Sequence, residues 1–191
     1  MDRLTQRYEF PDRFVAGTVG VPGQRTFYLQ ARQGNRLSSV VCEKQQLGIL
    51  AEHLERILNE LMNLMGPDAN IPGPIDRADD LGPLDQPIEE DFRVGTLTLA
   101  WDTGNDCVAI ELFSAVDLDE DEEGDAMEQT VERAEASLVV KLTPFEARQF
   151  IARAHALMTS GRPECPFCEQ PINPGGHICP RANGYRKALF D

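Results

Sequence analysis

The chain has 191 residues, 41% of them hydrophobic, and a formal net charge of −14 from 32 acidic and 18 basic side chains. A chain of this length and composition can bury a core of its own. An acidic surface repels phosphate backbones and anionic lipid, which disfavours nucleic-acid or membrane binding by the surface as a whole. No apolar run approaches the roughly 20 residues of a membrane helix, and no secretory signal pattern follows Met1. We therefore expect a cytoplasmic protein whose five cysteines are reduced or metal-bound.

Residues 1–65 are predicted to form a first βββα unit. Three strands are expected between glycine-containing turns, at residues 13–19, 25–31 and 37–42. A helix should follow from about Lys44 to Leu64, because its leucines and isoleucines recur at helical spacing. The Gly66-Pro67 pair ends that helix.

Residues 66–91 are rich in proline and glycine. Proline removes backbone donors and fixes φ, so neither a helix nor a central strand can run through this segment. We interpret it as a linker between two halves of the chain.

Residues 92–160 are predicted to form a second βββα unit. Its strands are expected at residues 92–101, 107–113 and 137–142, the first two joined as a hairpin. Thr143 is the expected N-cap of the following helix, with Pro144 at its first position and Glu146 closing a capping box.

An acidic loop, residues 115–136, interrupts this second half. Between Asp117 and Glu128 it carries eight of the acidic side chains. Charges this dense repel one another and stay solvated, which favours a disordered loop. A calcium site is the alternative, but the spacing does not fit the EF-hand pattern.

The two halves resemble each other in sequence. Residues 14–18, Phe-Val-Ala-Gly-Thr, recur as Phe-Arg-Val-Gly-Thr at residues 92–96. The apolar positions of the two predicted helices also align, at an offset of 100 residues, and the acidic loop accounts for the change in offset. An internal duplication is one interpretation. The predicted fold class is therefore α+β, a pseudo-duplicated βββα-βββα body with an antiparallel sheet and both helices on one face.

The C-terminal tail, residues 161–191, carries a metal-ligand pattern. Cys165 and Cys168 form a Cys-x2-Cys pair, and eight residues later His177 and Cys179 form His-x-Cys. Sulfur and nitrogen ligands in this number suit tetrahedral zinc, and a tail too short for its own core gains stability from a metal. The pattern predicts a zinc-knuckle-like tail with one Zn2+.

With four protein ligands the coordination sphere is closed, so the zinc is expected to be structural and not catalytic. An iron–sulfur centre or another metal is an alternative. A thioredoxin-like redox pair is disfavoured, because such a motif opens a helix after a strand, whereas this one follows a helix.

Other residues carry weaker signals. His53 and His155 lie in predicted helices, where a lone histidine is more often packed or exposed than catalytic. Cys42 and Cys107 lie in strand patterns and are expected to be buried apolar groups. The basic cluster at residues 181–187 either contacts RNA, phosphate or an acidic partner, or pairs with the protein's own carboxylates.

Several segments resemble an uncharacterised family of actinobacteria, domain of unknown function 3090. The resemblance rests on residues 14–20, 26–31, 43–45, 94–96, 100–102 and 161–185, of which the cysteine-containing tail is the most specific. It implies a cytoplasmic protein of unknown activity and supplies no catalytic residues. It also implies phosphomutase-like and kinase-like proteins encoded nearby, as possible partners.

The functional hypothesis is a non-enzymatic interaction or adaptor protein with a structural zinc site. One alternative is an enzyme or ligand-binding protein that takes a phosphorylated metabolite in a cleft between the halves. Its phosphate contacts would come from six basic residues: Arg13, Arg25, Arg32, Arg36, Lys44 and Arg93. Another alternative is RNA binding through the basic tail. The partner is expected to be a protein, without nucleic acid or membrane.

Overall fold

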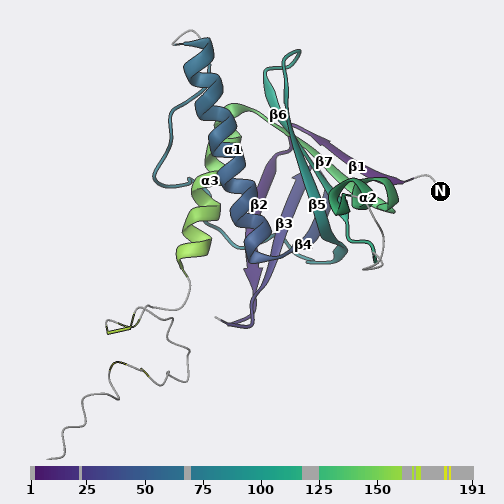
Figure 1. Ribbon diagram of the computed structural model, residues 1–191, viewed down its shortest axis with the longest axis vertical. Helices are drawn as coiled ribbons and strands as arrows, with labels where there is room; N and C mark the ends of the chain where they lie inside the picture. The colour runs from purple at the N-terminus through teal and green to yellow at the C-terminus, as the bar shows by residue number, and fades with distance from the viewer. Residues whose placement is uncertain are drawn as a thin grey trace, which may run out of the picture.

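The computed structural model describes residues 3–21, 23–66, 70–117, 125–160, 165, 167–168, 179 and 181. In this part of the chain, one seven-stranded sheet is covered by helices (Figure 1). This arrangement confirms the α+β class. None of the described helices is long and apolar enough to span a membrane.

The elements follow the predicted order closely. The strands are β1 (Leu4–Glu9), β2 (Arg13–Val19), β3 (Thr26–Gln33), β4 (Arg36–Cys42), β5 (Glu90–Asp102), β6 (Cys107–Ser114) and β7 (Ala136–Leu142). The helices are α1 (Lys44–Met65), α2 (Ala126–Arg133) and α3 (Pro144–Thr159). Each strand and helix predicted from sequence is present, with ends within two residues. The capping box of α3 is also confirmed, with Thr143 and Glu146 bonded reciprocally.

The sheet is mixed, where the sequence analysis expected an antiparallel one. Its strand order is β1-β7-β6-β5-β4-β3-β2. The pairs β4–β5 and β1–β7 are parallel, and the other neighbours are antiparallel. The parallel β4–β5 pair arises because α1 and the segment after it carry the chain back before β5 begins. Each half is thus an antiparallel run of three strands followed by a helix. Common descent of the halves stays a prediction.

Two elements were missed. β1 is short and polar, and it pairs with β7, more than 120 residues away in the sequence. No local sequence pattern therefore predicts it. α2 lies within the expected acidic loop. It begins after Asp125, whose carboxylate accepts a hydrogen bond from the Met127 amide, and Glu128 lies in its first turn. Acidic groups at a helix N-terminus are favourable. Residues 118–124, the densest part of that acidic stretch, lie outside the described residues.

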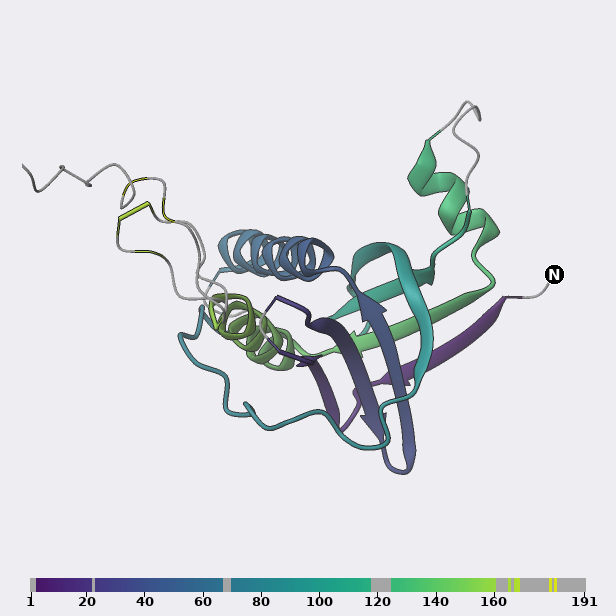
Figure 2. The same cartoon turned by 90° about the horizontal axis from the view of Figure 1, so that it is seen from below.

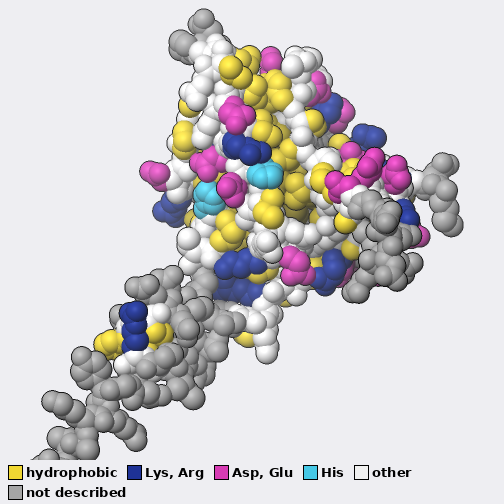
Figure 3. Space-filling view, in the orientation of Figure 1, with side chains coloured by type: hydrophobic (Ala, Val, Ile, Leu, Met, Phe, Trp, Pro, Cys, Tyr) yellow, Lys and Arg dark blue, Asp and Glu magenta, His cyan; other side chains and the backbone are white. Residues whose placement is uncertain are grey.

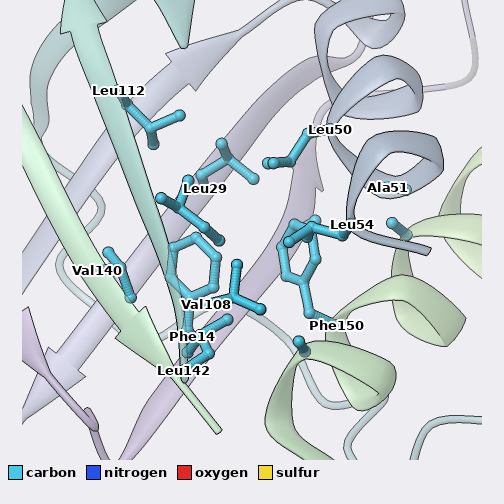
Figure 4. Packing of buried hydrophobic residues seen from close by; sticks show 14 of the residues in the cluster. Phe14, Leu29, Leu50, Ala51, Leu54, Val108, Leu112, Val140, Leu142 and Phe150 are labelled. Atoms are coloured by element: carbon cyan, nitrogen blue, oxygen red, sulfur yellow. The ribbon is translucent and has the colours of Figure 1, made fainter. Parts of the chain in front are cut away.

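The core lies between the concave face of the sheet and the pair α1 and α3, which lie side by side on that face (Figure 2). Phe14 of β2 stacks on Phe150 of α3 with ring centroids 5.0 Å apart. Leu50 and Leu54 of α1 contact the same cluster from the helix side, and Val108 and other sheet residues face it from the opposite side (Figure 4). Both helices thus bury their apolar faces on one side of the sheet, as predicted.

Residues 70–89, which we call the strap, have no helix or strand and yet pack against the body. Three apolar side chains anchor them, Ile71, Ala78 and Leu84. A Cβ on Gly17 of β2 would lie 2.5 Å from Leu84 Cγ, so the glycine makes room for that leucine. The segment predicted as a linker therefore crosses the body as a fixed strap.

Arginines from the helix layer and from a hairpin protect both edges of the sheet. At the β2 edge, Arg153 of α3 donates from Nε to the Ala16 carbonyl over 2.6 Å. At the other edge, Arg36 at the β3–β4 turn donates to the Arg7 carbonyl of β1 over 3.2 Å. Side chains that occupy edge carbonyls keep an edge strand from pairing with another chain.

Candidate metal centre

Three cysteines that are distant from the core converge beyond the end of α3. The Sγ atoms of Cys165, Cys168 and Cys179 all lie within 4.8 Å of one another. Cys165 and Cys179 are buried, and Cys168 is half-buried. All three are free thiols with no disulfide. The Cys-x2-Cys turn supplies the first two sulfurs and the returning chain brings the third, as the sequence predicts.

The spacing of the sulfurs fits a tetrahedral metal. Cys165 Sγ lies 3.7 Å from Cys179 Sγ. A zinc ion with Zn–S bonds of about 2.3 Å holds its sulfur ligands about 3.8 Å apart. A disulfide would require about 2.0 Å, so these two sulfurs are placed as co-ligands and not as a bonded pair. The cluster can therefore hold a metal ion.

The site also favours the thiolate form. Burial of Cys165 opposes ionisation, but hydrogen bonds with the amides of Phe167 and Cys168 and with the thiols of Cys168 and Cys179 act in the opposite direction. Together they lower the pKa of Cys165 to about 7. Thiolates are the form that binds metal. Arg181 donates to the Phe167 carbonyl over 2.9 Å, which ties the chain after Cys179 to the Cys165–Cys168 turn.

The remaining two cysteines are of a different kind. Cys42 and Cys107 lie on β4 and β6 and are buried in the core, as predicted. Burial, with Glu43 nearby, raises the pKa of Cys42 to about 12, and burial also raises the pKa of Cys107. Neither thiol is prepared to bind a metal. His177, the fourth predicted ligand, lies outside the described residues.

The six basic residues proposed to bind phosphate do not gather at one site, although Arg13 and Arg32 both pair with Asp85. Arg32, Arg93 and Arg13 pair with carboxylates, whereas Arg25 and Arg36 donate to backbone carbonyls. A cavity of about 180 Å3 does lie where β2, the strap and α3 meet, between the halves. Of the six residues only Arg13 lines it, and the lining also contains four acidic side chains: Asp12, Asp79, Asp80 and Glu146.

The two arginines that line this cavity are engaged in hydrogen bonds to the strap and to β2. Arg13 donates to Asp80 over 2.6 Å and to Asp85 over 3.0 Å. The bond from Arg13 lowers the pKa of Asp80 against the effect of partial burial. Arg153 donates to the carbonyls of Asp80 and Gly82 as well as to Ala16. We call this set the Arg153 junction, and its bonds hold the strap to the sheet edge and leave no arginine free for a phosphate.

Sequence reasoning missed Arg148 and Arg153, which are almost fully buried on α3. Arg148 donates to the Pro72 carbonyl of the strap and to Asn59 of α1. Their only signal in the sequence is that a charged residue occurs among the apolar positions of a helix. That signal is ambiguous, because their hydrogen-bond partners on the strap cannot be identified from the sequence. Of the basic cluster at 181–187, only Arg181 is described, so the RNA hypothesis falls largely outside the described residues.

Comparison with curated proteins and with solved structures finds no match. A family model described as "Protein of unknown function (DUF3090)" matches residues 6–179. The matched region contains the whole body, the strap and all four predicted ligands, Cys165, Cys168, His177 and Cys179. Because the match covers most of the sequence, the chain belongs to the DUF3090 family of proteins of unknown function.

Proposed function

We propose that this chain is a zinc protein in which Cys165, Cys168, His177 and Cys179 hold one structural ion, and that it serves as a non-enzymatic adaptor. The observation that carries the metal proposal is the 3.7 Å separation of Cys165 and Cys179 within a three-sulfur cluster. Cysteine sulfur with histidine nitrogen is the ligand set that zinc prefers among common metals.

A structural role follows from the number of ligands. Three thiolates and one imidazole complete a tetrahedron, so no position remains for water or substrate. His177 enters as the fourth ligand from the sequence pattern. The metal would then fix the chain after α3 into one shape, and a fixed exposed loop is suited to docking a protein. Phe167, exposed between the two cysteines of the turn, gives that loop an apolar contact point.

The metal proposal is tested by elemental analysis of purified full-length protein. We expect about one zinc per chain, and we expect both Cys165→Ser and His177→Gln to lower that content strongly. Cys42→Ala is the matched control, because it removes a core thiol and should leave the zinc in place. Iron in place of zinc, or full zinc content in Cys165→Ser, would contradict the proposal.

The adaptor role is tested with purified partners. The phosphomutase-like and kinase-like proteins that the family resemblance suggests are titrated with zinc-loaded protein and with Cys165→Ser in parallel calorimetry experiments. We expect binding to the zinc-loaded form and at least about tenfold weaker binding to the variant. Equal binding of both forms would place the docking surface elsewhere on the molecule.

A further inference from the structure

A second cavity of the body lies between α1 and β5. It encloses about 570 Å3, within the usual range of small-molecule sites. We call it the α1–β5 groove. Its lining includes Ile49, His53 and Arg56 of α1, Leu97 and Leu99 of β5, and Met127 of α2. Figure 3 shows hydrophobic side chains gathered between α1 and β5 on this face of the molecule.

The floor of the groove is apolar and incompletely covered. Leu97 and Leu99 belong to the core face of β5, yet both are only partly buried. Ile49 on one rim is 38% exposed and Met127 on the other is 47% exposed. Apolar groups left open to water on both rims and on the floor favour a ligand with an apolar body.

The glycine of β5 explains how α2 reaches this site. A Cβ on Gly95 would lie 2.7 Å from Ala115 Cα and 3.1 Å from Thr130 of α2. Without a side chain there, the chain after β6 passes close to β5, and α2 follows with Met127 at the rim of the groove. Gly95 was noted in sequence only as part of the repeated Phe-x-x-Gly-Thr pattern.

The two basic side chains that line the groove are unused within the described part of the chain, and none of the described lining residues is acidic. Within the described part of the chain, the Arg56 guanidinium and the His53 imidazole make no hydrogen bond or ion pair. On a chain with 32 acidic residues, the described lining of the groove contains one arginine, one histidine and no carboxylate, which favours a negatively charged ligand.

We propose that the α1–β5 groove binds a small amphipathic anion. Its carboxylate or phosphate group would pair with Arg56 and His53, and its hydrocarbon body would cover Leu97 and Leu99. An arginine pairs with either acid through charge-assisted hydrogen bonds. Burial of the hydrocarbon at about 25 cal/mol per Å2 supplies the rest of the affinity.

The single tryptophan of the chain, Trp101, provides a direct readout. Like Leu97 and Leu99, it is a partly buried residue of β5 that packs against the core, and it follows Leu99 by two residues. The zinc-loaded full chain is titrated with dodecanoate and with dodecyl phosphate, each below its micelle concentration, while tryptophan fluorescence is followed. We expect saturable binding of one molecule per chain, and the tighter of the two probes assigns the acid group.

Matched probes separate the parts of the ligand. Dodecanol keeps the hydrocarbon and lacks the anion, so it should bind at least about tenfold more weakly than the better anion. Inorganic phosphate lacks the hydrocarbon and should not saturate the site at comparable concentration. Equal binding of dodecanol, or no saturable binding of either anion, would overturn the proposal.

Variants locate the site. Arg56→Gln and Ile49→Asp should each weaken binding at least about tenfold, with an unchanged circular dichroism spectrum. The controls Arg77→Gln and Leu64→Asp change exposed residues outside the groove and should bind like the original chain. Unweakened binding by both groove variants would overturn the site. A second result would also overturn the site: the original chain sediments as a dimer without probe, and Ile49→Asp sediments as a monomer. The groove would then be an interface between two copies.

Discussion

The Arg153 junction and the α1–β5 groove are both places where a helix meets the sheet, but their polar groups are used in opposite ways. At the junction, the guanidinium of Arg153 is buried and donates to three backbone carbonyls and to Asp80. In the groove, Arg56 is exposed and has no partner among the described residues. Burial of a charge is costly unless the charge is hydrogen-bonded. The contrast indicates that the junction holds the fold together, whereas the groove is left open for a ligand.

Replacement of Arg153 by methionine gives the sharpest test of the structural side of this comparison. The change keeps the aliphatic part of the side chain but removes the donor to the carbonyls of Ala16 and Asp80, and it leaves the Gly82 carbonyl with Arg13 alone. We expect a loss of about 3 kcal/mol in the free energy of unfolding, measured with urea. Arg77→Met, at an exposed position, should change it by less than about 0.5 kcal/mol. A loss below about 1 kcal/mol for Arg153→Met would show that the junction is not structural.

Gly17→Ala tests whether the strap is fixed by packing as well as by hydrogen bonds. The new Cβ would overlap Leu84, which is buried against β2. We expect a destabilisation of about 1–3 kcal/mol, as is usual for overpacking. Leu84→Ala removes the side chain that the new Cβ would overlap. The double variant Gly17→Ala/Leu84→Ala should therefore lose at least about 1 kcal/mol less in the free energy of unfolding than the sum of the losses of the two single variants. Gly73→Ala, with open space around it, is the matched control.

The pH dependence of stability probes the charge pair within the junction. The bond from Arg13 lowers the pKa of Asp80 in the folded state, so folding favours the ionised carboxylate. Its contribution is complete above the unfolded pKa of about 3.9 and is lost as pH falls through the lower folded value. Asp80→Asn should therefore have a lower urea midpoint than the original chain at pH 7. The difference in midpoint between the two proteins should be smaller at pH 3. A difference that stays constant over this range would contradict the role of this ion pair.

The elements of the body could be predicted because their signals are local. The leucine spacing of α1 and the Thr143–Glu146 cap of α3 depend on residues within a few turns, and the structure confirms both. β1 could not be found in this way, because its partner strand lies at the far end of the sequence. α2 was missed for another reason: its Asp125 cap and Glu128 were counted only as charge in a loop.

The sites divide along the same line. The convergence of Cys165, Cys168 and Cys179 could be predicted because Cys-x2-Cys is itself a tight turn and the third cysteine follows within a short segment. The α1–β5 groove joins residues about 40 apart in the chain that share no motif, so sequence alone left His53 as an unremarkable helical histidine. The strap was underestimated because proline and glycine exclude regular structure but do not exclude tight packing.

The smallest effect is expected for Arg56→Gln in the groove, where the free energy of unfolding can be compared directly with that of Arg153→Met. Arg56→Gln removes a charge that no described residue uses, so the free energy of unfolding should change by less than about 0.5 kcal/mol. The same substitution should weaken binding of the anionic probe at least about tenfold, as argued above. Urea unfolding and probe titration on one preparation measure both quantities. A side chain that is neutral for folding but needed for binding is a ligand contact, whereas an Arg56→Gln loss as large as that of Arg153→Met would make both arginines structural and end the distinction.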